Sequence, residues 1–184
     1  MINTSDFTNY RVFFNLIKKD IFSLLALGCG NIRAEDQLGA KNILGVEWAD
    51  DRLDVAKGKA VVIKYDIREI TKIIPNKSFD AVTMFDVLEH INKGDGLTLL
   101  KKLEKKIKNQ IIIFIPVQPQ IQNFDLVNER QNERKEQNLS MGHHLSTWTP
   151  EEFEKLGFQI IKYSPNYHKE KGFGAVFCIK NLIN

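Results

Sequence analysis

Apolar residues gather in seven short runs along the chain. The runs cover residues 21–27, 43–46, 61–65, 80–85, 110–115, 158–163 and 174–180. The run at 110–115, within "QIIIFIPV", is apolar at consecutive positions, which is typical of a strand buried on both faces of a sheet. We therefore predict seven β-strands, with this run as a central strand that is buried on both sides and closed by Pro116.

Polar stretches compatible with helices separate the earlier runs. These stretches span residues 33–39, 50–58, 66–74 and 92–108. Alternation of this kind indicates βαβ units, which build a parallel sheet covered by helices on both faces. The last two runs are joined by "SPNYHKEKGFG" without a helix, so we expect them to form an antiparallel pair. The predicted fold is α/β, a Rossmann-like three-layer sandwich with a seven-stranded, mostly parallel sheet and an antiparallel C-terminal strand.

The chain is expected to form a single domain over residues 1–184, a length that can bury a substantial core. Apolar residues at helical spacing predict an N-terminal helix within residues 1–20. The segment 117–145 is long, polar and poor in apolar anchors. Connections of this length inside a domain are often functional, so we predict a lid on the substrate side, with a plain surface insertion as the alternative.

Composition sets limits on the partners and the compartment. Hydrophobic residues make up 43% of the chain and the net charge is +3, a mild value that does not favour nucleic acid as a partner. No apolar run approaches the roughly 20 residues of a membrane span, and the first residues lack the apolar core of a signal peptide. Cys29 and Cys178 are expected to be reduced, buried thiols. We therefore expect a cytoplasmic protein without a membrane partner.

Candidate ligand-binding residues stand where four of the predicted strands end. They are Gly28-Cys29-Gly30, Glu47, Asp66 and Asp86. The carboxyl ends of parallel strands meet at one edge of the sheet, where ligands bind. Glycines let the backbone turn sharply, and a carboxylate such as Glu47 can accept hydrogen bonds from ribose hydroxyls. Asp66 can accept from an adenine amino group while Ile67 packs on the ring, so the pattern predicts a nucleoside pocket.

The same segments resemble the class I S-adenosylmethionine-dependent methyltransferases. The matching stretches are "LGCG" at 27–30, "GVEWADDRLDVAK" at 45–57, "YDI" at 65–67, "SFDAVTMFDVLEHI" at 78–91 and "HLSTWTPEEFEKLGF" at 144–158. The resemblance runs from about residue 21 to 180, and "FDAVTMFDVLEH" is similar to the subgroup that acts mostly on small molecules. It implies the seven-stranded fold, methyltransferase activity and S-adenosylmethionine as cofactor.

The resemblance also implies roles for individual residues. The turn formed by Leu27, Gly28, Cys29 and Gly30 would border the methionine portion of the cofactor. Glu47 would bind the ribose, with Trp48 beside the adenine. The adenine would also contact Asp66 and Ile67, and the turn at Phe85 and Asp86 would lie near the sulfonium and amino-acid end.

Two positions depart from the family pattern. Ala26 stands where the family usually has an acid, and Ile32 stands where a third glycine is common. Both positions bear on cofactor binding, so a non-catalytic binding or partner module is an alternative to an enzyme. Methylation of RNA or protein is a further alternative, although "FDVLEH" differs from the Asn/Asp-Pro-Pro-aromatic turn of enzymes that methylate nucleobase amino groups.

Methyl transfer depends mainly on alignment and the exclusion of water, and an alcohol acceptor also profits from a general base. Histidine titrates near neutral pH, so the candidate bases are His90, His143 and His144. Adjacent histidines also suggest a metal, but no Cys, Asp or Glu lies at a convincing ligand spacing, so no metal site is expected. Trp148 is interpreted as packing for a helix capped by Thr147 or Thr149. The leading hypothesis is O-methylation of a small molecule, such as a glycan or a metabolite precursor.

Overall fold

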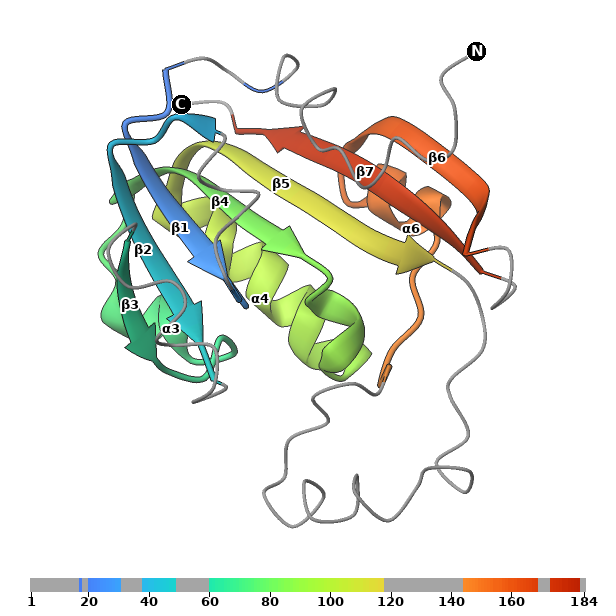
Figure 1. Cartoon of the computed structure of the whole chain (residues 1–184), viewed down its shortest axis with the longest axis horizontal. Coiled ribbons are helices and arrows are strands. Elements are labelled where there is room, and N and C mark those ends of the chain that lie inside the picture. Colours follow the sequence, from blue (N-terminus) through green and yellow to red (C-terminus); the bar gives the residue numbers. More distant parts are fainter. Residues whose placement is uncertain are drawn as a thin grey trace, which may run out of the picture.

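The computed structural model describes residues 17, 20–30, 38–48, 60–117, 144–168 and 173–182. These residues build a seven-stranded sheet with the strand order β3-β2-β1-β4-β5-β7-β6 (Figure 1). The strands are β1 (Ser23–Leu27), β2 (Asn42–Glu47), β3 (Val61–Lys64), β4 (Phe79–Phe85), β5 (Ile107–Val117), β6 (Gln159–His168) and β7 (Phe173–Asn181).

The first five strands of the sheet are parallel, and β7 runs against them. β1 pairs in parallel with both β2 and β4, while β7 lies antiparallel between β5 and β6. The chain moves outward from β1 to β3 and then returns to the other side of β1 with β4. This reversal creates a switch point between β1 and β4, where α/β sheets bind their ligands. The predicted α/β fold with an antiparallel C-terminal strand is confirmed.

The described helices pack on one face of the sheet (Figure 1). They are α3 (Ile70–Ile73), the 3-10 turn η3 (Leu88–His90), α4 (Lys93–Lys106) and α6 (Pro150–Lys155). In α4, Leu99, Leu100 and Leu103 fall on one side at helical spacing and are buried against the strands. Their burial fixes the long helix beneath the sheet and sets the position of its amino-terminal end.

Alternation along β1 divides the core into two clusters. Leu25 and Leu27 face the helices, while Leu24 and Ala26 belong to the cluster on the opposite face. Ala26 is fully buried there. That second cluster includes Ile17 from the predicted N-terminal helix, most of which lies outside the described residues. The predicted helices at 33–39 and 50–58 and most of the predicted lid at 117–145 also lie outside them.

Several predicted boundaries are wrong. α4 ends at Lys106, because Ile107 adopts an extended backbone and pairs with Phe79 at the start of β5. Ile107 therefore belongs to the sheet, although in sequence it continues the apolar face of α4. β5 also passes Pro116 by one residue, since its pairing with β7 continues to Val117. The final hairpin is longer than its apolar runs, as β6 extends to residue 168.

The described part of the chain contains no helix long and apolar enough to cross a membrane. Cys29 and Cys178 are both free and buried, as expected. Burial raises the pKa of the Cys178 thiol, so this group stays protonated and unreactive.

Candidate active site

The predicted ligand-binding residues meet at the carboxyl edge of the sheet. Leu27, the last residue of β1, pairs with Val46 of β2 on one side and with Met84 of β4 on the other. The N–H groups of Gly28 and Cys29 both donate to the carbonyl of Val46, at 2.8 and 3.2 Å. The turn after β1 therefore lies between the ends of β2 and β4, at the switch point.

The two glycines of this turn have different surroundings. Both have left-handed backbone, with φ of +60° at Gly28 and +49° at Gly30. A Cβ added to Gly28 would lie 2.6 Å from Cγ2 of Val87, whereas one added to Gly30 would meet none of the described residues within 4 Å. Gly28 thus lets the β1 turn pack against the turn after β4, and no described residue crowds Gly30 at the site.

Glu47 is held over the glycine turn. It ends β2 and is only 5% exposed. Its Oε2 accepts from the N–H of Gly30 at 2.9 Å, and its Oε1 accepts from the N–H of Trp48 at 2.8 Å. Each carboxylate oxygen can accept a second hydrogen bond. A carboxylate whose two oxygens are fixed in this way is suitable for the two hydroxyls of a ribose.

Asp66 follows β3 and makes a two-pronged ion pair with Arg68. The Arg68 Nε lies 3.0 Å from Oδ1, and Nη2 lies 2.6 Å from Oδ2. The side-chain hydrogen bond from Arg68 lowers the pKa of Asp66, so the carboxylate is ionised at neutral pH. The ion pair between Arg68 and Asp66 was not predicted from the sequence. A basic residue two positions after an acid in a turn could have indicated it.

The ends of β2 and β3 also place the predicted adenine neighbours. Trp48 is 37% exposed, and the Nζ of Lys64 lies 5.8 Å from the centroid of its ring. Ile67 is partly buried against the core. An apolar ring and an apolar side chain near the Asp66 carboxylate are suitable for a flat heterocycle that carries an amino group.

The turn after β4 carries a strained acidic residue. Asp86 has φ of +55°, and its N–H donates to the carbonyl of Phe114 at 2.9 Å. Its side chain reaches solvent, yet the surrounding protein removes enough hydration to raise the pKa of Asp86 to about 6. Left-handed backbone in a non-glycine residue is uncommon and often marks a functional turn.

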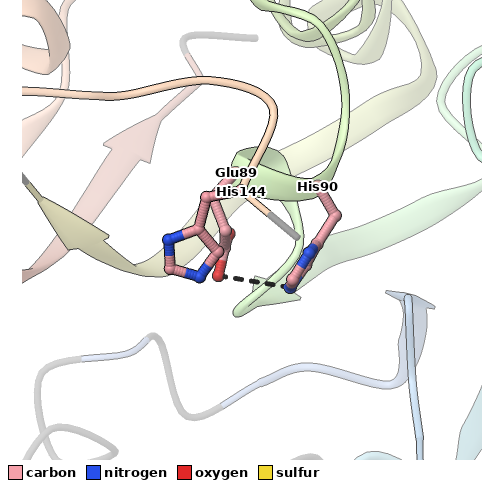
Figure 2. Close-up of side chains that lie close together, drawn as sticks. All are labelled: Glu89, His90 and His144. Atoms are coloured by element: carbon pink, nitrogen blue, oxygen red, sulfur yellow. Dashed lines mark ion pairs between the residues drawn. The ribbon is translucent and has the colours of Figure 1, made fainter. Parts of the chain in front are cut away.

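A carboxyl–imidazole cluster follows three residues later. It consists of Glu89, His90 and His144 (Figure 2). The Nε2 of His90 lies 3.7 Å from Oε1 of Glu89, and the two imidazoles meet edge to face with centroids 5.4 Å apart. Glu89 is 2% exposed, and burial together with the neighbouring Asp86 raises its pKa. The predicted bases His90 and His144 are thus brought together, while His143 lies outside the described residues.

His144 reaches this cluster because its segment is hydrogen-bonded to η3. The N–H groups of Leu145 and Ser146 donate to the backbone carbonyl of Glu89, at 2.6 and 3.1 Å. The Ser146 hydroxyl donates to the carbonyl of Leu88 at 2.9 Å, and it accepts from the indole N–H of Trp148 at the same distance. These bonds fix the segment before α6 against the turn after β4.

Trp148 and the cap of α6 fit their predicted structural roles. Trp148 is fully buried and stacks on Phe153 of α6, with ring centroids 5.2 Å apart. Thr149 is the capping residue, and with Glu152 it forms a reciprocal capping box. The side chain that anchors the His144 segment is therefore part of the core rather than of the ligand surface.

Comparisons with known proteins agree with this arrangement. Residues 25–115 match the family model described as "Methyltransferase domain". No curated protein sequence matches the chain.

Solved structures with the same fold cover nearly the whole chain. An S-adenosylmethionine-dependent methyltransferase from Archaeoglobus fulgidus is 20% identical, with a TM-score of 0.61 over 96% of this chain and 92% of that one. One described as a putative S-adenosylmethionine-dependent methyltransferase from Listeria monocytogenes is 18% identical, with a TM-score of 0.61 over 96% and 98%. One from Mesorhizobium loti is 14% identical, with the same TM-score over 97% and 100%. These likenesses establish the fold.

Proposed function

We propose that the chain is a class I S-adenosylmethionine-dependent methyltransferase that methylates a hydroxyl oxygen of a small molecule, since residues 25–115 match a methyltransferase-domain family model. The observation that carries the proposal is the cluster of Glu89, His90 and His144 directly after the turn at the end of β4. An alcohol attacks a methyl group effectively only when it gives up its proton, and a carboxyl–imidazole cluster can assist that step.

The residues at the carboxyl edge fit S-adenosylmethionine. Glu47 would hold the ribose, because both of its oxygens are fixed beside Gly30, which no described residue crowds. Asp66 would accept from the adenine amino group, with Ile67 and Trp48 against the ring. When bound, the cofactor supplies the methyl group as an electrophile on a positively charged sulfur.

The methionine end of the cofactor would lie between two turns. The first is Leu27–Gly30, in which Cys29 is buried and the glycines keep the backbone close. The second is the turn at Phe85 and Asp86, in which Asp86 is exposed near the end of β4. A negative side chain at this position is suitable for the ammonium group of a methionine moiety.

A hydroxyl acceptor is favoured over an amine for a chemical reason. A neutral amine already has a free electron pair, whereas a hydroxyl is a poor nucleophile until its proton is removed. Of the candidate bases, His90 and His144 lie in the described cluster, and His143 remains a candidate from its sequence position. The mild net charge of +3 favours a small acceptor over a nucleic acid.

The proposal is tested with S-adenosylmethionine labelled in its methyl group and a panel of acceptors in matched pairs. Each pair contains a hydroxylated compound, such as a phenol or a sugar, and its O-methyl ether, with amines and a short RNA as further acceptors. We expect label in hydroxylated compounds and none in the ethers. Transfer only to amines or RNA would overturn the O-methylation proposal, as would binding of the cofactor without transfer to any acceptor.

A further inference from the structure

The carboxyl–imidazole cluster has the composition of a metal site. We propose that Glu89, His90 and His144 bind a divalent transition-metal cation, which holds the acceptor hydroxyl for methylation. One ligand atom from each of these residues lies within 4.8 Å of the other two. Figure 2 shows the three side chains extending from η3 and from the segment before α6 into the same region. The inference rests on the proposed O-methylation, and it has His90 and His144 activate the acceptor hydroxyl through the cation instead of as general bases.

Glu89 gives an independent indication of a missing positive partner. Its side chain is 2% exposed, and Oε2 is buried without a hydrogen-bond partner within the described part of the chain. A buried carboxyl oxygen without a partner is costly, because it has lost its water and gained nothing in return. A cation bound between the imidazoles would supply the missing interaction.

The ligand set indicates which class of cation is bound. Two imidazole nitrogens and one carboxylate favour zinc or cobalt over manganese, magnesium and calcium, which prefer oxygen ligands. Bonds of about 2.0–2.2 Å place the ligand atoms of one ion about 3 Å apart. Glu89 Oε1 and His90 Nε2 are already 3.7 Å apart, and His90 and His144 are only partly buried, so side-chain rotation can close the difference.

The surrounding structure supports a preformed site. The backbone carbonyl of Glu89 accepts from Leu145 and Ser146, so the two segments that carry the ligands are bonded directly to each other. Asp86 adds a second acidic group close enough to act on Glu89 electrostatically. Three protein ligands leave coordination positions open, which is characteristic of catalytic rather than structural metal sites.

The chemistry of the site follows from its place beside the β4 turn. A hydroxyl that binds a divalent cation loses its proton to water more easily than a free hydroxyl does. The resulting oxygen forms a bond to the methyl carbon, the carbon–sulfur bond breaks, and the sulfur keeps the electron pair. The products are a methyl ether, S-adenosylhomocysteine and one proton.

The test measures metal binding without cofactor or acceptor. Protein treated with a chelator and dialysed is titrated with Co²⁺, Mn²⁺ and Mg²⁺ by calorimetry, and Co²⁺ is also followed by visible absorption. We expect one Co²⁺ per chain, weaker Mn²⁺ binding and no measurable Mg²⁺ binding. Glu89→Gln and His144→Ala should each weaken Co²⁺ binding by at least about 10-fold.

Glu69→Gln is the matched control, because it removes an exposed carboxylate that pairs with Lys72. This control should bind Co²⁺ as the wild type does. Equal Co²⁺ affinity in the wild type and in the folded His144→Ala variant would overturn the metal site, even if Glu89→Gln failed to fold. Loss of metal binding would leave O-methylation open, whereas metal binding without transfer to any hydroxyl would contradict only the proposed function.

Discussion

Trp148 occupies space that only a glycine at position 96 leaves free. A Cβ added to Gly96 of α4 would lie 2.8 Å from Cζ2 of the buried indole. The Nζ of Lys93, one turn earlier in the same helix, lies 3.7 Å from the centroid of the indole ring. Trp148 in turn bonds to Ser146, which is fixed to η3. The position of His144 therefore depends on a glycine in a helix that does not itself contribute to the cluster.

Gly96→Ala is expected to destabilise the protein. Overpacking against Trp148 costs about 1–3 kcal/mol, partly offset by the gain in helix propensity of up to about 1 kcal/mol. Urea unfolding measures the net loss. Gly94→Ala is the control in the same helix, because a Cβ there meets none of the described residues within 4 Å, and it should be neutral or slightly stabilising. Equal effects of the two substitutions would contradict the packing of Trp148 on Gly96.

Glu47→Gln should weaken binding of S-adenosylmethionine by at least about 10-fold, because hydrogen bonds to a charged group contribute roughly 1.5–3 kcal/mol. Calorimetry with the purified protein measures this change. Glu47→Ala would also cost stability, because it removes the acceptor of the bonds from the N–H groups of Gly30 and Trp48. The glutamine variant is therefore the cleaner test, and unchanged affinity would mean that the ribose lies elsewhere.

Gly28→Ala and Gly30→Ala should differ in their effect on stability. Both substitutions place alanine in left-handed backbone, which costs roughly 1–2 kcal/mol. Only the change at Gly28 also drives a methyl group into Val87, at 2.6 Å from Cγ2. We expect a larger fall in melting temperature for Gly28→Ala, measured by circular dichroism. A larger fall for Gly30→Ala would contradict the uncrowded surroundings assigned to that position among the described residues.

Asp80 should make stability depend on pH at acidic values. It accepts from the N–H groups of Phe22 and Ser23 and from the Nζ of Lys108, at 3.0, 2.8 and 2.9 Å. Burial acts to raise the pKa of Asp80, but the hydrogen bonds from Lys108 and Ser23 outweigh it and lower the pKa. A lowered pKa in the folded state means that the stabilisation is complete above the unfolded value near 3.9 and is lost as the pH falls further.

The measurement compares the free energy of unfolding of wild type and Asp80→Asn at several pH values. At neutral pH the variant should be less stable by about 1–3 kcal/mol, because the partly buried donors from Phe22, Ser23 and Lys108 lose a charged acceptor. The difference should shrink as the pH falls below about 4, where Asp80 becomes protonated. A difference that stays constant down to pH 2 would contradict the charged role of Asp80.

Much of the fold could be predicted because it depends on local patterns. Continuous apolar runs such as the one around Ile112 identify strands buried on both faces, and the run of Leu99, Leu100 and Leu103 identifies a helix face. Boundaries were less predictable. Ile107 continues a helical pattern in sequence but joins β5, because pairing with β4 competes successfully with helix propensity.

The binding edge could also be predicted in part. The strand order follows general rules of parallel sheets, so the residues that end the strands, such as Gly28 and Glu47, necessarily meet at one edge. The partners of those residues could not be predicted. Arg68 donates to Asp66, and the backbone N–H of Gly30 donates to Glu47. Both hydrogen bonds depend on the final backbone conformation of each turn.

The sequence by itself determined the strand pattern, the family resemblance and the acidic residues at the strand ends, because these depend on local periodicity and short motifs. Only the tertiary structure decided that Glu89 lies beside His144, although 55 positions separate them along the chain. Spacing along the chain gives no sign of this proximity, because Glu89 and the paired histidines stand in separate segments. The carbonyl of Glu89 and the indole of Trp148 bring the two segments together through hydrogen bonds and packing. Hydrogen bonds and packing between distant segments produce no periodic pattern of residues, so the sequence alone does not predict them.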